Sequence, residues 1–121
     1  MEPIFETELG KLYQADCLEF LPTVEDASVD LVFADPPFNL GKDYGNGRSD
    51  SLVAEEYLDW CGRWIAEGVR ALKPGGAFFL WNLPKWNVEL GHRLNQEGML
   101  MRHWIAVDIK YSMPIPGRLY P

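Results

Sequence analysis

The sequence predicts an α/β fold with a mostly parallel sheet. Segments rich in β-forming residues alternate with segments of helical periodicity, and the gaps between strands leave room for crossover helices. The length of 121 residues suits one domain, and apolar residues make up 47% of the chain, which is sufficient for a packed core. These observations favour a doubly wound sheet with right-handed crossovers, in which ligands bind beyond the carboxyl ends of the strands.

The first half of the chain supplies two strand candidates. Residues 11–15 are a short candidate that ends at Asp16, and residues 17–21 follow as one or two helical turns stopped by a proline. Residues 29–34 are nearly continuous in β-forming residues, as a strand buried on both faces should be. The double proline that comes next cannot continue a ladder of hydrogen bonds, so the strand is expected to end there.

The middle of the chain contains the clearest helix. Residues 52–72 place apolar side chains at helical spacing, with acidic residues near the start and basic residues near the end, as the helix dipole favours. The Pro-Gly-Gly sequence at 74–76 predicts the end of this helix, and residues 77–81 predict a second buried strand. Residues 39–51 are rich in glycine and polar residues and predict a mobile flap.

The last third of the chain is less regular. Residues 86–97 predict a weaker helix closed by Gly98, and residues 101–110 predict a long strand. Trp104 lies in that strand, and we favour core packing for it over contact with a ligand. Residues 112–121 are rich in proline and show no period.

Composition limits the partners of the chain. A formal net charge of −7 argues against a DNA-binding surface on this chain, because Lys and Arg supply most of the affinity for phosphates. Cys17 and Cys61 lack disulfide or zinc spacing and are expected to be reduced and buried. His92 and His103 have no companions at metal-ligand spacing, so no metal is expected. The N-terminus has no apolar signal region and the longest apolar run is too short to span a bilayer, which predicts a cytoplasmic location without a membrane partner.

The segment Asp35-Pro36-Pro37-Phe38, directly after the predicted 29–34 strand, is the strongest candidate for a site. Two prolines fix two φ angles and hold the preceding carboxylate in one direction. The Asp35 carboxylate and the Pro36 carbonyl would then be prearranged hydrogen-bond acceptors for an amino group, which is electrostatic rather than covalent catalysis. The alternative is a turn that merely ends the strand.

This segment resembles the catalytic motif of the DNA amino-methyltransferases (the DNA methylase N-4/N-6 family), in which Asp, Asn or Ser precedes Pro-Pro and an aromatic residue. Aspartate at the first position is similar to the adenine-modifying members. Few residues precede Asp35 and none forms a glycine-rich loop, so the chain resembles the β-group, whose catalytic half comes before the cofactor loop. The resemblance implies a partial class I S-adenosylmethionine-dependent methyltransferase fold, which is Rossmann-like.

The resemblance also implies a cofactor site for S-adenosylmethionine. Residues 10–21 resemble the opening of the β-group, in which Asp16 and the backbone at Cys17 would approach the adenine end of the cofactor. Asp35 would contact the cofactor as well as the target base. Asp16 serves equally well as a helix N-cap, and one residue can fill both roles.

Contacts with the target base are implied at five positions. Phe38 would stack on a base that is flipped out of DNA, and Asn39 would lie next to it. Lys42 and Tyr44 belong to the flap, although solvated loop residues are the reading we favour for each singly. Tyr111 would stack on the other face of the base, and core packing is an equal alternative.

Two parts of a complete β-group enzyme are not recognised in the sequence, namely the glycine-rich cofactor loop and the target-recognition region. Residues 1–121 are therefore expected to be the catalytic part of a single methyltransferase domain that acts on adenine in DNA. A second polypeptide or a missing C-terminal half would supply the cofactor loop, and an exposed sheet edge would favour self-association. The alternatives are an inactive remnant that acts as a binding module, and an amino-methyltransferase for cytosine or RNA.

Overall fold

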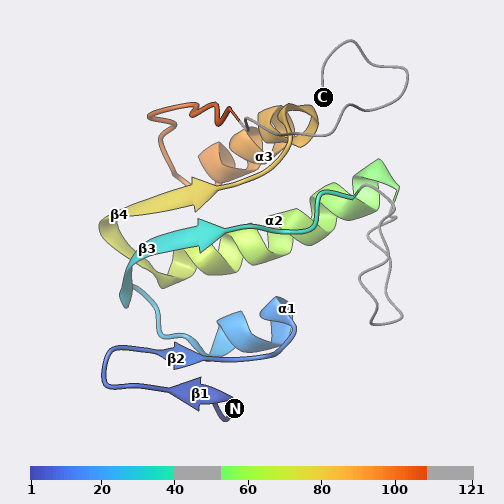
Figure 1. The fold of residues 1–121 in the computed structure, drawn as a ribbon. Coiled ribbons are helices and arrows are strands. Elements are labelled where there is room, and N and C mark those ends of the chain that lie inside the picture. Colours follow the sequence, from blue (N-terminus) through green and yellow to red (C-terminus); the bar gives the residue numbers. More distant parts are fainter. Residues whose placement is uncertain (40–52, 109–121) are drawn as a thin grey trace.

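The computed structural model describes residues 1–39 and 53–108. It shows an α/β arrangement built around one strand–helix–strand unit, with a small hairpin at the N-terminal end (Figure 1). The elements are β1 (Phe5–Glu6), β2 (Lys11–Leu12), α1 (Cys17–Phe20), the 3-10 helix η1 (Leu21–Thr23), β3 (Val29–Ala34), α2 (Ala54–Ala71), β4 (Leu72–Leu80) and α3 (Pro84–Gln96).

Strands β3 and β4 pair in parallel, as the sequence predicts. Val32 lies opposite Phe78 and Ala34 lies opposite Leu80, and the ladder is irregular only near its start. The amide of Trp81 donates to the carbonyl of Ala34 at 2.9 Å, so the two strands stay in register up to their carboxyl ends. Parallel neighbours need a long crossover connection, and here α2 provides it.

Helix α2 packs one face of this strand pair, and α3 packs against α2 (Figure 1). The helix forms because its apolar residues recur at helical spacing, and Glu55 and Glu56 suit the positive end of the helix dipole. The core consists of six buried residues of α2 and α3, with Ala34, Phe78 and Leu80 of the strands packed against them. The six are Tyr57, Cys61, Trp64, Ile65, Trp86 and Leu90.

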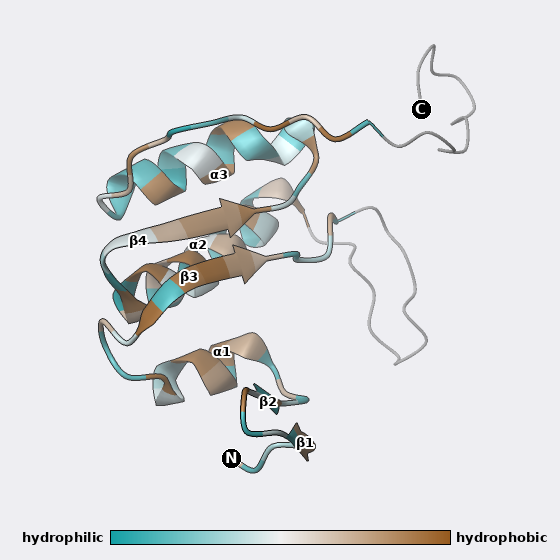
Figure 2. Cartoon of the chain, turned by 60° about the vertical axis from the view of Figure 1, so that its left-hand side comes forward, coloured by the Kyte–Doolittle hydropathy of each residue, from teal (hydrophilic) through white to brown (hydrophobic). Residues whose placement is uncertain are grey.

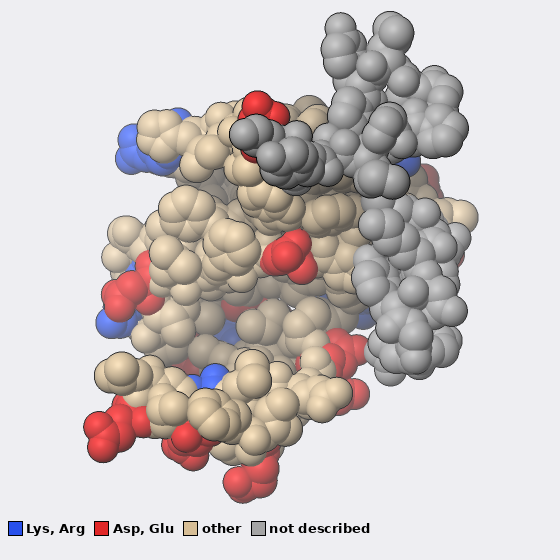
Figure 3. All heavy atoms as spheres, in the orientation of Figure 1, with Lys and Arg blue, Asp and Glu red and all other residues tan. Residues whose placement is uncertain are grey.

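The opposite face of the strand pair is open, which corrects the prediction that both strands are buried on two faces. Leu31 is 53% exposed, Phe33 is 62% exposed and Phe79 is 43% exposed. Figure 2 shows how apolar β3 and β4 are, and Figure 3 shows this face as a broad surface with few charges. The apolar sequence of these strands suits burial on two faces, but within residues 1–39 and 53–108 only one face has a helix packed on it.

The N-terminal strand differs from the prediction in its length and in the strand that it pairs with. The strand covers Lys11–Leu12, shorter than the predicted 11–15, and it pairs antiparallel with β1, which the sequence analysis did not predict. Helix α1 follows as expected, but Pro22 lies inside η1 and does not stop the helical turns. Proline is tolerated there because the first turn of a helix leaves its N–H groups unpaired in any case. In Figure 1, β2, β3 and β4 all point to the same side.

The prediction of a long strand over 101–110 is wrong for the residues described. Residues 101–108 form no strand, and Trp104 is 51% exposed, which also contradicts the core packing favoured for it. A β-forming sequence becomes a strand only where a neighbour accepts its hydrogen bonds, and in the described part of the chain β4 pairs only with β3. Positions 109 and 110 lie outside the described residues. By contrast, α3 lies close to the predicted 86–97, and Gly98 follows it with a φ of 88°.

The connection from η1 to β3 is fastened to the last turn of α2 by Arg70. Its guanidinium donates to the carbonyls of Leu21 and Val24 at 2.8 Å each, and it forms ion pairs with Asp26 and Glu67. The hydrogen bonds with these two carboxylates raise the pKa of Arg70 further above its ordinary value, with Asp26 as the larger cause. Arg70 thus fixes the start of β3 relative to α2.

Gly68 marks the closest approach of α2 to the sheet, because a Cβ there would lie 2.9 Å from the Phe78 ring and 3.6 Å from Val32. We predict that Gly68→Ala lowers the free energy of unfolding, since overpacking costs about 1–3 kcal/mol and exceeds the helix-propensity gain of about 1 kcal/mol. Gly91→Ala is the matched control, because a Cβ at Gly91 of α3 meets nothing within 4 Å. Urea denaturation should show a lower free energy of unfolding for Gly68→Ala and a higher one for Gly91→Ala. Equal increases in both variants would contradict the close packing at Gly68.

Candidate functional site

The segment Asp35-Pro36-Pro37-Phe38 lies directly beyond the carboxyl end of β3, beside the end of β4. Asp35 and Pro37 are exposed, whereas Pro36 and Phe38 are half-buried. Within the described ranges, the Asp35 carboxylate makes no ion pair or hydrogen bond with another side chain. The carboxylate is therefore accessible at the edge of the sheet where ligands of parallel sheets bind.

Two buried aromatic side chains donate hydrogen bonds to the backbone of this segment. The Tyr57 hydroxyl donates to the carbonyl of Pro37, and the indole N–H of Trp86 donates to the carbonyl of Phe38 at 2.8 Å. Asn82, just beyond β4, donates from its side-chain amide to the Tyr57 oxygen at 3.0 Å. The sequence predicts none of these three contacts. A polar residue at the end of a strand is the one signal that would have pointed to Asn82.

The chain leaves the motif through Asn39, which has a positive φ of 57°. Asparagine tolerates this left-handed conformation better than most residues do, so the motif can end in a sharp change of direction. Asn39 itself is half-buried. Lys42, Tyr44 and Tyr111, the other predicted contacts of the base, lie outside the described residues.

Asp16 and Cys17 stand at the start of α1. One carboxylate oxygen of Asp16 accepts the amide of Leu18 at 2.8 Å, so the N-cap role is confirmed. Cys17 is half-buried, and burial, followed by the charge of Asp16, raises the pKa of its thiol. No hydrogen bond or ion pair joins either residue to Asp35 in the described part of the chain, but the ends of β2 and β3 lie on the same side of the molecule (Figure 1).

A hollow of about 350 Å³ opens beside Cys17. It is lined by Lys11, Tyr13, Ala15, Cys17 and Phe20. Two of these lining side chains, Tyr13 and Phe20, are aromatic and give the hollow an aromatic wall, and their ring centroids lie 4.6 Å apart. This wall suits a flat aromatic ligand, because aromatic rings bury a large area and prefer offset or tilted neighbours.

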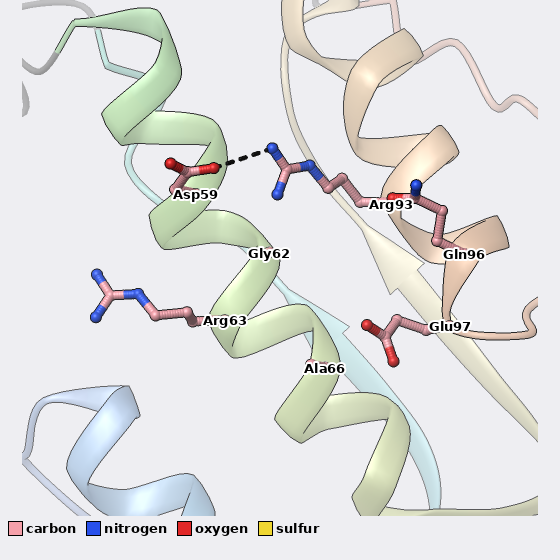
Figure 4. A pocket seen from close by; sticks show the side chains of 7 residues that line it. All are labelled: Asp59, Gly62, Arg63, Ala66, Arg93, Gln96 and Glu97. Carbon is pink, nitrogen blue, oxygen red and sulfur yellow. Dashed lines mark hydrogen bonds and ion pairs between the residues drawn. The ribbon is translucent and has the colours of Figure 1, made fainter.

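A second groove, of about 430 Å³, lies between α2 and α3 (Figure 4). Arg93 crosses it to pair with Asp59 at 3.2 Å, and its guanidinium passes over Gly62. Charges of both signs line it, and it contains none of the predicted site residues. Its position between helices, away from the strand ends, sets it apart from the motif.

Two further expectations concern metals and membranes. Across residues 1–39 and 53–108, no cluster of His, Cys, Asp and Glu side chains could hold a metal ion. Among the same residues, none of the helices combines the length and the apolarity needed to cross a bilayer.

Comparison with known proteins identifies the family. The sequence pattern that describes the DNA methylase family matches residues 29–120, so this chain belongs to the family of N6/N4 DNA methylases. Over all 121 residues it is 51% identical to the type II methyltransferase M.BamHI of Bacillus amyloliquefaciens, of which it covers 28%.

Two relatives of lower identity are also methyltransferases. The type II methyltransferase M.HpaI of Haemophilus parainfluenzae is 35% identical over 97 residues, which are 79% of this chain and 31% of that protein. The DNA adenine methyltransferase YhdJ of Escherichia coli (strain K12) is 36% identical over 78 residues, which are 64% of this chain and 26% of that protein. The chain thus spans about a quarter to a third of the length of these relatives.

The two thiols differ in burial, which leads to a prediction about their reactivity. Cys61 is 0% exposed, and burial raises its pKa to about 11, whereas Cys17 is only half-buried. Because the thiolate is the reactive form, iodoacetamide at pH 8 should modify Cys17 first and leave Cys61 intact until the protein unfolds. Mass spectrometry of the peptides measures this order, with Cys17→Ser as the control. Equal labelling of both thiols in the folded protein would contradict the observed core.

Proposed function

We propose that this chain is the catalytic part of an S-adenosylmethionine-dependent methyltransferase that methylates the exocyclic amino group of adenine in DNA. The observation that carries the proposal is the accessible Asp35-Pro36-Pro37-Phe38 segment at the carboxyl end of a parallel strand. Membership in the DNA methylase family supports it. The parallel β3–α2–β4 unit is compatible with the class I, Rossmann-like fold that we propose for the complete domain.

The chemistry follows from the weakness of the amino group as a nucleophile. Its lone pair is delocalised into the base, so hydrogen bonds to its N–H groups help only where the acceptors are prearranged. In the proposed site the Asp35 carboxylate and the Pro36 carbonyl are these acceptors. S-adenosylmethionine supplies an electrophilic methyl group when it is bound. Phe38 stacks on the flipped base, and Asn39, Lys42, Tyr44 and Tyr111 remain proposed neighbours of that base.

The residues near α1 fit the adenine end of this cofactor. The hollow beside Cys17 has an aromatic wall of Tyr13 and Phe20, which suits a purine ring. Asp16 is exposed, and only one of its two carboxylate oxygens accepts the N-cap hydrogen bond. The cap therefore fixes the carboxylate and leaves the other oxygen for a ligand. The residues described fit the group, and Asp16 and Cys17 are the ones that would hold it.

The complete activity requires more polypeptide than this chain. The chain spans 28% of the length of M.BamHI, and the open face with Leu31, Phe33 and Phe79 is apolar. We propose that the remainder of the domain, on the same or a second polypeptide, covers this face and supplies the rest of the cofactor site. The net charge of −7 supports the proposal that phosphate contacts to DNA also belong to that remainder.

The first test of this function is the Asp35 carboxylate. This chain, combined with a polypeptide that supplies the remainder of the domain, should transfer labelled methyl groups from S-adenosylmethionine to DNA. Asp35→Ala should abolish transfer with an unchanged melting temperature, because the exposed carboxylate contributes to the transition state and little to packing. Asp35→Asn keeps nearly the same shape, so its rate of methyl transfer separates the effect of the lost charge from the effect of the lost volume.

Digestion of the methylated DNA to nucleosides identifies the base. N6-methyladenine is the expected product, and N4-methylcytosine alone would show that the base is wrong while the amino-methyltransferase function holds. Near-normal turnover of Asp35→Ala would refute the assigned site.

The second test concerns the stacking role of Phe38. Phe38→Ala should weaken capture of the flipped base by about 1–3 kcal/mol, the usual contribution of an aromatic side chain to base stacking. Phe38→Trp keeps a flat ring and should retain activity. Fluorescence of 2-aminopurine placed at the target position reports the flipped base. A Trp variant without activity beside a normal Ala variant would exclude stacking.

A further inference from the structure

The sequence of the motif limits how its backbone can be held in place. Proline has no backbone N–H, so Pro36 and Pro37 cannot donate hydrogen bonds to the rest of the protein. Beyond the end of the β3 ladder, these two prolines can be fixed only through their carbonyl oxygens or by packing. A segment that must hold two acceptors in place therefore needs donors from elsewhere in the fold.

The structure supplies these donors from two different helices. Tyr57 near the start of α2 donates to the Pro37 carbonyl, and Trp86 near the start of α3 donates to the Phe38 carbonyl at 2.8 Å. The two rings lie 4.8 Å apart between centroids, and the residues are 1% and 5% exposed. The core packing therefore fixes the positions of both side chains, and with them the two hydrogen-bond donors.

A hydrogen bond from Asn82 orients the Tyr57 hydroxyl group. The side-chain amide of Asn82 donates to the Tyr57 oxygen at 3.0 Å, which leaves the hydroxyl proton for Pro37. Asn82 is itself held, because its side-chain oxygen accepts the amide of Leu83 at 2.7 Å and its carbonyl accepts the side-chain amide of Asn87 at 3.2 Å. A chain of hydrogen bonds therefore runs from the end of β4 to the segment after β3.

We propose that Tyr57, Asn82 and Trp86 are positioning residues for methyl transfer. They occupy the Pro37 and Phe38 carbonyls and so hold the Asp35 carboxylate and the Pro36 carbonyl at the place where the target amino group binds. This inference rests on the proposed function and extends it to side chains outside the motif. Packing alone does not require the polar atoms, because phenylalanine would fill most of the same volume at positions 57 and 86.

The chain offers a matched control for this proposal. Trp64 is as buried as Trp86, at 5% exposure, and within residues 1–39 and 53–108 its indole N–H has no hydrogen-bond partner. Trp86→Phe and Trp64→Phe therefore make similar losses of volume in one core, and only the first removes a donor to the motif. Tyr57→Phe removes a single oxygen atom and leaves the ring in place.

The first measurement uses this chain as it is. Backbone 15N relaxation at Phe38 and Asn39, the first residues after the prolines that carry an N–H, reports the order of the motif. Tyr57→Phe and Trp86→Phe should lower the order parameters at both positions, whereas Trp64→Phe should leave them unchanged. Unchanged values in all three variants would overturn the proposal.

The second measurement uses the reconstituted enzyme. Tyr57→Phe and Trp86→Phe should each lower kcat by roughly 10- to 100-fold, the scale of a misplaced catalytic group, with little change in KM for S-adenosylmethionine. Trp64→Phe should keep kcat even where it lowers the melting temperature. Equal kcat losses in Trp64→Phe and Trp86→Phe, or a normal kcat in Tyr57→Phe, would overturn the positioning role. If Asp35→Ala is also active, the proposed function has failed; if Asp35→Ala is inactive, only the positioning role has.

Discussion

The aromatic contact between α2 and α3 is the interaction on which the rest of this structure depends. The rings of Tyr57 and Trp86 close the core between the two helices, and the polar atoms of the same rings hold the backbone of the motif. Burial of the rings fixes the helices, and hydrogen bonds from their tips fix the segment after β3. Packing and site geometry are therefore coupled through the same two side chains, and a change that loosens the core moves the motif with it.

The parallel pairing of β3 and β4 brings together residues that are distant in sequence. Ala34 and Leu80 end their strands side by side, so Asp35 and Asn82 follow at neighbouring positions along one edge. Helix α2 makes this pairing possible and covers one face only, which leaves Leu31, Phe33 and Phe79 exposed on the other. An apolar face of this kind is costly in water, and it fits a chain that spans about a quarter to a third of its relatives.

The negative charge of this chain bears on the proposed function, because the proposed substrate is DNA. Acidic side chains gather over the N-terminal segment, where Glu2, Glu6 and Glu8 are all exposed (Figure 3). A surface of this sign repels the phosphate backbone, whereas an uncharged base that has left the helix is not repelled. In the proposed function, this chain therefore contacts the target base, and the remainder of the domain holds the duplex.

The sequence alone determined the local features of this protein, since these depend on neighbouring residues. The strand Val29–Ala34 was predicted with its observed bounds, and α2, α3 and the N-cap at Asp16 were predicted nearly as they are found. Tertiary structure decided what depends on partners distant in sequence. In the described part of the chain, residues 101–108 have β-forming side chains but pair with no strand, and no helix covers the face that carries Leu31 and Phe33. Trp86 is a hydrogen-bond donor to the motif as well as a core residue. Periodicity reports which side chains prefer burial, and only the fold decides what they are buried against.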